Sequence, residues 1–378
     1  MRIAQIAPLD EAVPPKLYGG TERVVSFLTE ELVALGHDVT LFASGDSETS
    51  AHLVATWPCA LRLDPSVNDP MAPLLLEMNE VAAHSGEFDI LHFHLGYWPF
   101  PLFSRLRTPF VTTLHGRLDI PEFRPLYDAF SDVPVVSISD AQRLPLPQAK
   151  YVRTVPHGLP ERLLTPRACT PSYLAFLGRV CPEKGVDSAL RIARSCGIPL
   201  RIAAKVDKAD RDYYREAIEP LLAGGGVEMV GEVNDQQKPA FLSGASTLLL
   251  PIRWPEPFGL VMIEAMACGC PVIAFGCGSV PEIVEDGVTG FIVDDEAGAI
   301  DAVARLPELS RNAIRQRFEQ RFTARRMAQD YLDVYRQVAA DFASRAGPMA
   351  DRAVLEPLPG AAPRGSPGKS PVGRSRAP

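Results

Sequence analysis

Residues 255–275 read PEPFGLVMIEAMACGCPVIAF, and the only charged side chains among them are Glu256 and Glu264. An unpaired carboxylate is among the costliest groups that an apolar interior can hold. Both glutamates therefore need partners, which are either cations of the protein or polar groups of a ligand.

The stretch itself predicts a loop, a helix and a strand in succession. Pro255 and Pro257 disfavour a helix around Glu256, because proline restricts both its own backbone and that of the residue before it. A helix is expected from near Gly259, and it is apolar nearly all round, which is typical of a buried helix. Glu264 then lies about one turn inside that helix, either in a structural ion pair or in contact with a ligand.

Apolar, β-branched segments alternate with amphipathic helical segments along nearly the whole chain. This alternation is typical of parallel sheets covered by helices, so the fold class is α/β. Residues 19–37 show apolar residues at helical spacing, with Gly36 as the stop. Strands are expected at 2–8, 38–44, 88–94, 109–115, 133–139 and 151–156, and again at 172–178, 199–205, 227–231, 246–252, 271–275 and 290–294.

The segment LLTPRACTPS, residues 163–172, interrupts the alternation with two prolines and predicts a linker. The restart after it predicts two Rossmann-like domains that face each other across a cleft, with ligands outside the carboxyl ends of the strands. Residues 323–345 predict one helix of about 35 Å, long enough to cross back to the first domain. The expected units are 1–165, 166–322, a crossover helix at 323–346 and a disordered tail at 347–378.

Composition narrows the classes of partner. The formal net charge of −8 argues against nucleic acid as a partner, because affinity for phosphate backbones comes from clustered Lys and Arg. No apolar stretch is long enough for a membrane span, and the N-terminus lacks the apolar core of a signal peptide. A cytoplasmic location and small-molecule or protein partners are expected.

Two cations follow the first strand of the second domain. They are Arg179 and Lys184 in LGRVCPEKG, residues 177–185, where a strand ends and a helix begins. Helix N-termini favour anions, so these side chains are placed to hold a diphosphate. Two solvated loop cations are the alternative.

The first domain offers three further candidates. Gly19 and Gly20 open a helix after the first strand and allow backbone N–H groups to approach an anion closely, although a plain tight turn fits equally well. His115 stands where a strand ends, which directs its imidazole towards the cleft, although a structural role fits a lone histidine equally well. His92 and His94 share one face of a strand, and packing there is favoured over a metal pair because no third ligand is evident.

Other kinds of chemistry lack their motifs. There is no P-loop and no complete G-x-G-x-x-G, so no nucleotide cofactor is expected. The one D-x-D by letter, at 210–212, falls in the polar start of a helix and offers a metal ion no anchor. No G-x-S-x-G elbow is present, so acyl transfer is not supported.

Taken together, GRVCPEKG and the segment PEPFGLVMIEAMACGCPVIAFGCGSVPEIVEDGVTGFIV closely resemble the second domain of retaining GT-B glycosyltransferases of family 4. GGTERVVSFLTEELVALGHDVTLFA and DILHFH are similar to the matching parts of the first domain. The resemblance covers roughly residues 1–345. It implies a GT-B fold, with an acceptor domain followed by a nucleotide-sugar donor domain, and no bound metal or cofactor.

The resemblance also implies roles for individual residues. Glu264 is expected to contact the ribose of the donor, and Glu256 and His115 the transferred sugar. The diphosphate is expected to lie against Arg179 and Lys184, with the N–H groups of Phe258, Gly259 and Leu260, while Gly19 and Gly20 close over it from the first domain.

The chain departs from the family pattern in places. His157 stands where the family often has Asn. AAKVD, residues 203–207, replaces a more usual glycine-containing loop, which makes Lys205 an added candidate contact. GCGSVPEIV replaces a frequent GG-x-PE sequence, but Gly278 and Glu282 are kept and the loop shape is expected to survive.

The expected activity is transfer of a hexose, with UDP-glucose as the first choice of donor, to an acceptor that the sequence does not name. The N-terminal segment is also similar to a branch labelled as tetrahydrobiopterin glucosyltransferases. A GT-B-fold nucleotide-sugar epimerase and a non-catalytic sugar-nucleotide-binding protein are the alternatives.

Overall fold

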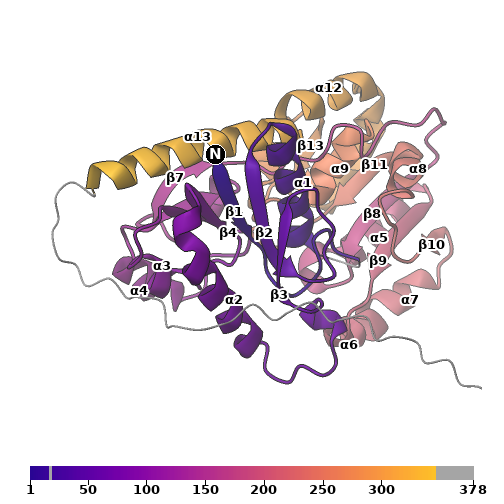
Figure 1. The fold of residues 1–378 in the computed structure, drawn as a ribbon. Helices are drawn as coiled ribbons and strands as arrows, with labels where there is room; N and C mark the ends of the chain where they lie inside the picture. Colours follow the sequence, from indigo (N-terminus) through magenta and orange to yellow (C-terminus); the bar gives the residue numbers. More distant parts are fainter. Residues whose placement is uncertain (17–18, 346–378) are drawn as a thin grey trace, which may run out of the picture.

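The computed structural model describes residues 1–16 and 19–345, and there the chain forms two α/β units, each built on its own parallel sheet (Figure 1). This confirms the predicted fold class of two Rossmann-like domains. The tail predicted at 347–378 lies outside the described residues.

The first sheet has seven strands in the order β3-β2-β1-β4-β5-β6-β7. The edge strand β3 was not predicted, because its side chains are partly exposed and its letters lack a clear apolar run. The bounds are β1 Arg2–Ile6, β2 Asp38–Ser44, β3 His52–Trp57, β4 Ile90–Phe93, β5 Phe110–Thr113, β6 Pro134–Ser137 and β7 Lys150–Thr154.

The second sheet has six strands in the order β10-β9-β8-β11-β12-β13. In each sheet the strand order reverses beside the first strand, at β1/β4 and at β8/β11, and such switch points are where open α/β sheets bind ligands. The bounds are β8 Tyr173–Arg179, β9 Leu200–Lys205, β10 Val227–Met229, β11 Ala245–Leu250, β12 Val272–Phe275 and β13 Gly290–Val293.

Helices cover both sheets, as the right-handed crossovers between parallel strands require. In the first domain, α1 and α2–α4 belong to different apolar clusters, on opposite faces of the sheet. The bounds are α1 Gly20–Ala34, α2 Met71–His84, α3 Phe100–Phe103, α4 Phe123–Ala129, α5 Val186–Cys196, α6 Arg211–Tyr213, α7 Glu219–Leu222, α8 Lys238–Ser243, α9 Leu260–Ala267, α10 Val280–Ile283, α11 Glu296–Arg305, α12 Arg311–Arg321 and α13 Ala324–Arg345.

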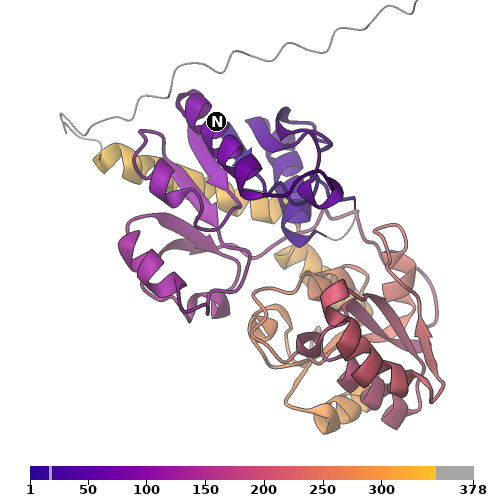
Figure 2. The same cartoon turned by 90° about the horizontal axis from the view of Figure 1, so that it is seen from below.

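The last helix ties the two domains together. α13, in yellow, leaves the second domain and runs along the first, where it packs against α1, β5 and β7 (Figures 1 and 2). At its start Leu159 pairs with Thr323, through a hydrogen bond from the Leu159 N–H to the Phe322 carbonyl at 2.9 Å and one from the Ala324 N–H to the Leu159 carbonyl at 2.8 Å.

Gly158 is required where these two segments meet. A Cβ on this residue would lie 2.8 Å from the backbone nitrogen of Ala324 and would also overlap the Thr323 carbonyl. We expect Gly158→Ala to lower the free energy of unfolding by about 1–3 kcal/mol, because backbone atoms on both sides must shift. Gly86→Ala is the control, since nothing lies within 4 Å of a Cβ there. Equal denaturant midpoints for the two variants would contradict this account of the junction.

Candidate functional site

Glu264 is buried at the boundary between the two domains. The residue is 2% exposed, and its carboxylate accepts hydrogen bonds from Arg23 on α1 of the first domain and from Lys238 at the start of α8, the latter at 2.7 Å. Asp235 completes the group, with Arg23 at 2.6 Å and Lys238 at 3.3 Å. Two cations and two carboxylates thus form a neutral cluster that spans both domains.

This cluster explains how the apolar helix α9 can hold a buried carboxylate. Burial alone would raise the pKa of Glu264, but the nearby charges of Lys238 and Arg23 outweigh burial and lower the pKa from 4.5 to about 2. The carboxylate is therefore ionised at neutral pH in spite of its burial. The sequence left a structural ion pair as one of two alternatives and could not identify Arg23, which lies 241 positions away.

Glu256 lies in the loop between β11 and α9 and is paired within the second domain. Lys184 donates to its carboxylate, and the indole N–H of Trp254 donates to the same oxygen at 3.0 Å. The Lys184 ammonium also lies 5.4 Å from the centre of the Trp254 ring, within the range of a cation–π contact. The structure thus brings together Glu256 and Lys184, which belong to separate motifs in the sequence.

The other two candidate cations of the second domain, Arg179 and Lys205, are more exposed to solvent than Lys184. Arg179 is the last residue of β8, and its guanidinium lies 3.4 Å from Asp210 with 45% of the side chain exposed. Lys205 is the last residue of β9 and lies 3.0 Å from Asp207. Both cations are at the carboxyl end of the sheet, beside the turn that carries Lys184.

The start of α9 is shaped by glycine. Gly259 is the N-cap of the helix with a φ of +78°, in the left-handed region that favours glycine. The carbonyl of the buried Phe258 accepts a hydrogen bond from the Ser279 hydroxyl at 2.9 Å. The N–H of Ser279 donates to the Glu256 carbonyl, also at 2.9 Å. Leu260 begins the helix, and the first N–H groups of a helix lack partners within it.

Gly278 and Glu282 hold this loop in place. A Cβ on Gly278, which has a φ of +60°, would overlap the backbone of Glu256, so only glycine allows this close packing. Glu282 reaches the first domain and accepts hydrogen bonds from the N–H groups of Asp140 and Ala141, both at 2.7 Å. This is a second polar contact between the domains, apart from Glu264.

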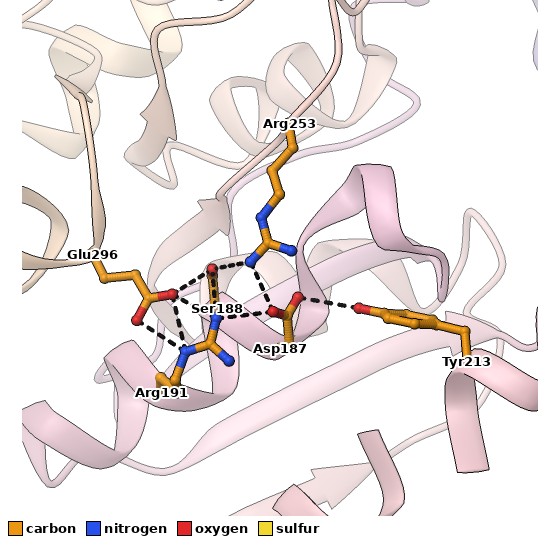
Figure 3. Close-up of polar contacts among 6 residues, drawn as sticks. All are labelled: Asp187, Ser188, Arg191, Tyr213, Arg253 and Glu296. Carbon is orange, nitrogen blue, oxygen red and sulfur yellow. Dashed lines mark hydrogen bonds and ion pairs between the residues drawn. The ribbon is translucent and has the colours of Figure 1, made fainter. Parts of the chain in front are cut away.

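A polar network that the sequence did not reveal surrounds Arg253, three residues before Glu256 in the chain (Figure 3). Arg253 precedes Trp254 and donates to Asp187 and to the Ser188 hydroxyl, both at 2.7 Å. Its backbone N–H donates to the carbonyl of Glu183 at 2.8 Å. These bonds join the loop carrying Glu256 to the turn carrying Lys184, so the two candidate site residues are held by the same network.

The network continues with hydrogen bonds within α5 and between α5 and α11. The Ser188 hydroxyl donates to Glu296 at 2.6 Å, while Arg191 donates to Glu296 at 2.6 Å and to Asp187 at 2.8 Å (Figure 3). Burial alone would raise the pKa of Asp187, but hydrogen bonds from Arg253 and Arg191 lower it to about 2. Arg253 directly precedes Trp254 in the sequence, but its partners Asp187 and Ser188 lie 66 and 65 positions away.

His115, in the first domain, belongs to a group of ring side chains. Its Nε2 lies 2.9 Å from Nδ1 of His94, and its ring stacks on that of His157 with centroids 5.3 Å apart. The His157 ring in turn lies edge-on to Phe258 of the second domain, at 4.8 Å. Burial lowers the pKa of His115 to about 3, so the imidazole is neutral at pH 7.

His92 and His94 are buried and hydrogen-bonded, as is usual for polar side chains inside a fold. His92 lies 2.7 Å from both the Tyr335 and the Thr113 hydroxyls, and His94 lies 2.8 Å from the Gln5 side-chain oxygen. Among the described residues, no group of three or more His, Cys, Asp or Glu side chains is arranged to hold a metal ion.

Gly19 and Gly20 lie at the N-terminus of α1, the helix that carries Arg23. Gly19 is the N-cap, and a Cβ on it would lie 2.8 Å from both the Glu22 carboxylate and the Pro15 ring. Gly20 has open space around it, since no atom lies within 4 Å of the position that a Cβ would take there. Gly19 is thus required by close packing, and Gly20 leaves the first turn of the helix uncovered.

Comparison with known protein families gives one match in each domain. Residues 18–159 match the model described as Glycosyltransferase Family 4, and residues 166–324 match the model described as Glycosyl transferases group 1. The two matches fall on the two sheets in turn. Each domain thus resembles a different glycosyltransferase domain model.

Curated relatives carry several kinds of acceptor in their names. D-inositol 3-phosphate glycosyltransferase of Rhodococcus erythropolis is 33% identical over 46% of this chain and 43% of its own length. Phosphatidyl-myo-inositol mannosyltransferase of Mycobacterium leprae is 26% identical over 84% of this chain and 90% of its own. The chain spans less than half the length of the first curated relatives that it matches.

Solved structures share the fold at lower identity. Sucrose-phosphate synthase from Thermosynechococcus elongatus superposes with a TM-score of 0.73 at 21% identity, covering 90% of this chain and 99% of that one. HepE from Anabaena, solved in complex with UDP-glucose, superposes with a TM-score of 0.67 at 18% identity, covering 91% of this chain and 100% of that one.

None of the helices in the described part of the chain has the length and apolar character that a membrane span requires.

The Glu264 cluster makes a prediction about acid stability. Because its folded-state pKa of about 2 lies below the ordinary 4.5, Glu264 contributes stability above pH 4.5 that is lost as the pH falls towards 2. The full contribution is about 3 kcal/mol. We expect Glu264→Gln to lower the free energy of unfolding at pH 7 and to flatten its decline below pH 4.5, measured by denaturant titration at several pH values.

The control variant is Glu228→Gln, which removes one carboxylate from an exposed ion pair with Arg201. Exposed pairs contribute about 0–1 kcal/mol, so this variant is expected to follow the wild-type profile. Parallel pH profiles for Glu264→Gln and the wild type would show that the buried cluster does not carry the acid dependence.

Proposed function

We propose that this chain transfers a hexose from a nucleotide-sugar donor to an acceptor with retention of configuration, and that UDP-glucose is the donor to test first. The observation that carries the proposal is the ionised Glu264 carboxylate, buried between Lys238 and the first-domain Arg23. A buried carboxylate at a domain boundary is suited to accept hydrogen bonds from the two ribose hydroxyls of a nucleotide. The HepE complex with UDP-glucose supports the choice of donor.

The ion pairs of the site suggest how the donor binds. Lys184 neutralises Glu256, and Arg179 lies beside Asp210. A diphosphate that attracts Lys184 and Arg179 draws both cations from these carboxylates. Glu256 is then free to accept hydrogen bonds from the hydroxyls of the sugar. Phosphate binding and sugar recognition are thus coupled through the Lys184–Glu256 pair.

The same groups serve the chemical step. Departure of the nucleoside diphosphate leaves negative charge on its outer phosphate and positive charge at the anomeric carbon. Lys184, Arg179 and the N–H groups at Phe258, Gly259 and Leu260 are proposed to face this phosphate, and electrostatic stabilisation of that kind is usually the largest catalytic contribution. We propose that they neutralise the leaving group without a metal ion, with Lys205 as an added contact.

The first domain is proposed to close over the donor. Gly19 and Gly20 would cover the phosphates, and His115 would contact the sugar. On the acceptor side, Trp98 is 41% exposed and stacks on Tyr97 with ring centroids 5.3 Å apart. Such a platform fits the apolar face of a ring. The relatives name chemically different acceptors, so the acceptor is left open.

The proposal is tested with a panel of UDP-, GDP- and ADP-sugars, with cell extract as the source of acceptors and product analysis by mass spectrometry. We expect one donor to be consumed with formation of a glycosylated product. A donor that is hydrolysed or epimerised without an acceptor would favour an epimerase instead. If no donor is bound or consumed, the transferase proposal fails.

Lys184 provides a sharper test with the donor identified above. We expect Lys184→Met to lower kcat by about 10²–10³, because the variant removes a charge aimed at the developing negative charge. Arg201→Met is the matched control, since it removes one exposed cation of the same domain that is paired with Glu228. Full turnover by Lys184→Met would exclude the proposed role at the diphosphate.

A further inference from the structure

A continuous chain of hydrogen bonds joins His115 to the interior of the first domain. His115 Nε2 lies 2.9 Å from His94 Nδ1, and His94 Nε2 lies 2.8 Å from the Gln5 side-chain oxygen. The Gln5 amide nitrogen donates to the Tyr335 hydroxyl at 2.9 Å. Gln5 and His94 are buried, with exposed fractions of 0% and 4%. We propose that Gln5, acting through His94, is the positioning residue that fixes which nitrogen of His115 carries the proton.

The direction of the chain follows from which groups can donate. Burial holds the pKa of His94 well below its ordinary value and that of His115 at about 3, so each ring is neutral and has one donor and one acceptor nitrogen. The Gln5 oxygen can only accept, so the proton of His94 lies on Nε2. His94 Nδ1 must then accept, and it does so from Nε2–H of His115. The Nδ1 of His115 is left as a hydrogen-bond acceptor.

The far end of the chain agrees with this direction. The Tyr335 oxygen accepts from Gln5, so its O–H is free to donate to Nδ1 of His92 at 2.7 Å. His92 Nε2–H then donates to the Thr113 hydroxyl at 2.7 Å, and Thr113 meets Tyr331 at 2.8 Å. Every ring nitrogen of His92 and His94 has a partner. Between Gln5, His94 and His115, reversing one member would place two donors or two acceptors face to face, so these three reverse together or not at all.

This inference rests on the proposed function, in which His115 contacts the transferred sugar. A fixed acceptor at Nδ1 takes a hydrogen bond from a sugar hydroxyl without a change of tautomer. If the proton moved to Nδ1, that same hydroxyl would have to turn and accept. Gln5 and His94 themselves touch no substrate. Their effect is to orient His115 and to fix its tautomer before the donor arrives.

The direct test is ¹⁵N NMR of the histidine rings in the full chain, without substrate, at pH 7. We expect His115 in the wild type to carry its proton on Nε2. In Gln5→Glu, the buried carboxylate is expected to hold His94 as an imidazolium with both nitrogens protonated. His115 Nε2 must then accept, and its proton moves to Nδ1. A wild-type His115 with the proton on Nδ1, or one that keeps Nε2–H in Gln5→Glu, would overturn the proposal.

Gln5→Met provides a second variant of similar size should Gln5→Glu fail to fold. Without a partner for His94, the two tautomers of His115 are expected to exchange and give averaged ¹⁵N shifts. We expect kcat with the donor to fall about tenfold, because a contact to the sugar is less well oriented. Donor affinity should change less. Unaltered His115 shifts in Gln5→Met would also overturn the proposal.

Tyr173→Phe is the matched control. It removes one buried tyrosine hydrogen bond, to the Phe241 carbonyl at 2.6 Å in the second domain, and leaves the histidine chain intact. It should lower stability without altering the His115 shifts or turnover. The two proposals fail separately. Normal tautomer control in a chain that consumes no donor would refute the proposed function alone, and turnover without tautomer control would refute the role of Gln5.

Discussion

The arrangement of this site depends on one buried carboxylate. Glu264 lies on an apolar helix, 2% exposed, and remains ionised because Lys238 and Arg23 reach it from two different elements. Removing one partner of such a group generally costs several kcal/mol, since a buried charge is left uncompensated. Arg23 belongs to the first domain. The stability of the second domain's helix is therefore linked to the position of the first domain.

The same principle extends to the other charged groups at the carboxyl edge of the second sheet. Glu256 is neutralised by Lys184, and Arg179 lies beside Asp210. Each cation proposed to bind a phosphate already has a carboxylate nearby. The free energy of donor binding is then the difference between two sets of ion pairs, rather than the full attraction between cation and phosphate. In the proposed function, such exchange would favour a ligand that offers both a diphosphate and hydroxyl groups.

Much of the second domain's structure could be predicted from the sequence, because the patterns that indicate it involve residues close together in the chain. The strands of the second domain, the loop at Glu256 and the apolar helix around Glu264 follow from letters close together in the chain. The ion-pair partners of the charged side chains could not be predicted in this way. Arg23 and Glu264 are 241 residues apart, and Arg253 meets Asp187 at a separation of 66. Neither pairing leaves a periodic pattern, so only the folded chain reveals it. The edge strand β3 was missed for the opposite reason, since its half-exposed face weakens the local signal itself.

The C-terminal helix shows how one element can serve stability and the site together. Its first residues are hydrogen-bonded to Leu159 at the junction between the domains. Farther along, Tyr331 and Tyr335 enter the interior of the first domain, and their hydroxyls join Thr113, His92 and Gln5. An apolar helix face would have packed equally well but would have left those polar groups unpaired, at the cost of their desolvation. The tyrosines therefore allow a polar chain to exist beneath His115. The position of α13 on the first domain, which the junction with the second domain fixes, is then also a condition for the hydrogen bonding of that histidine.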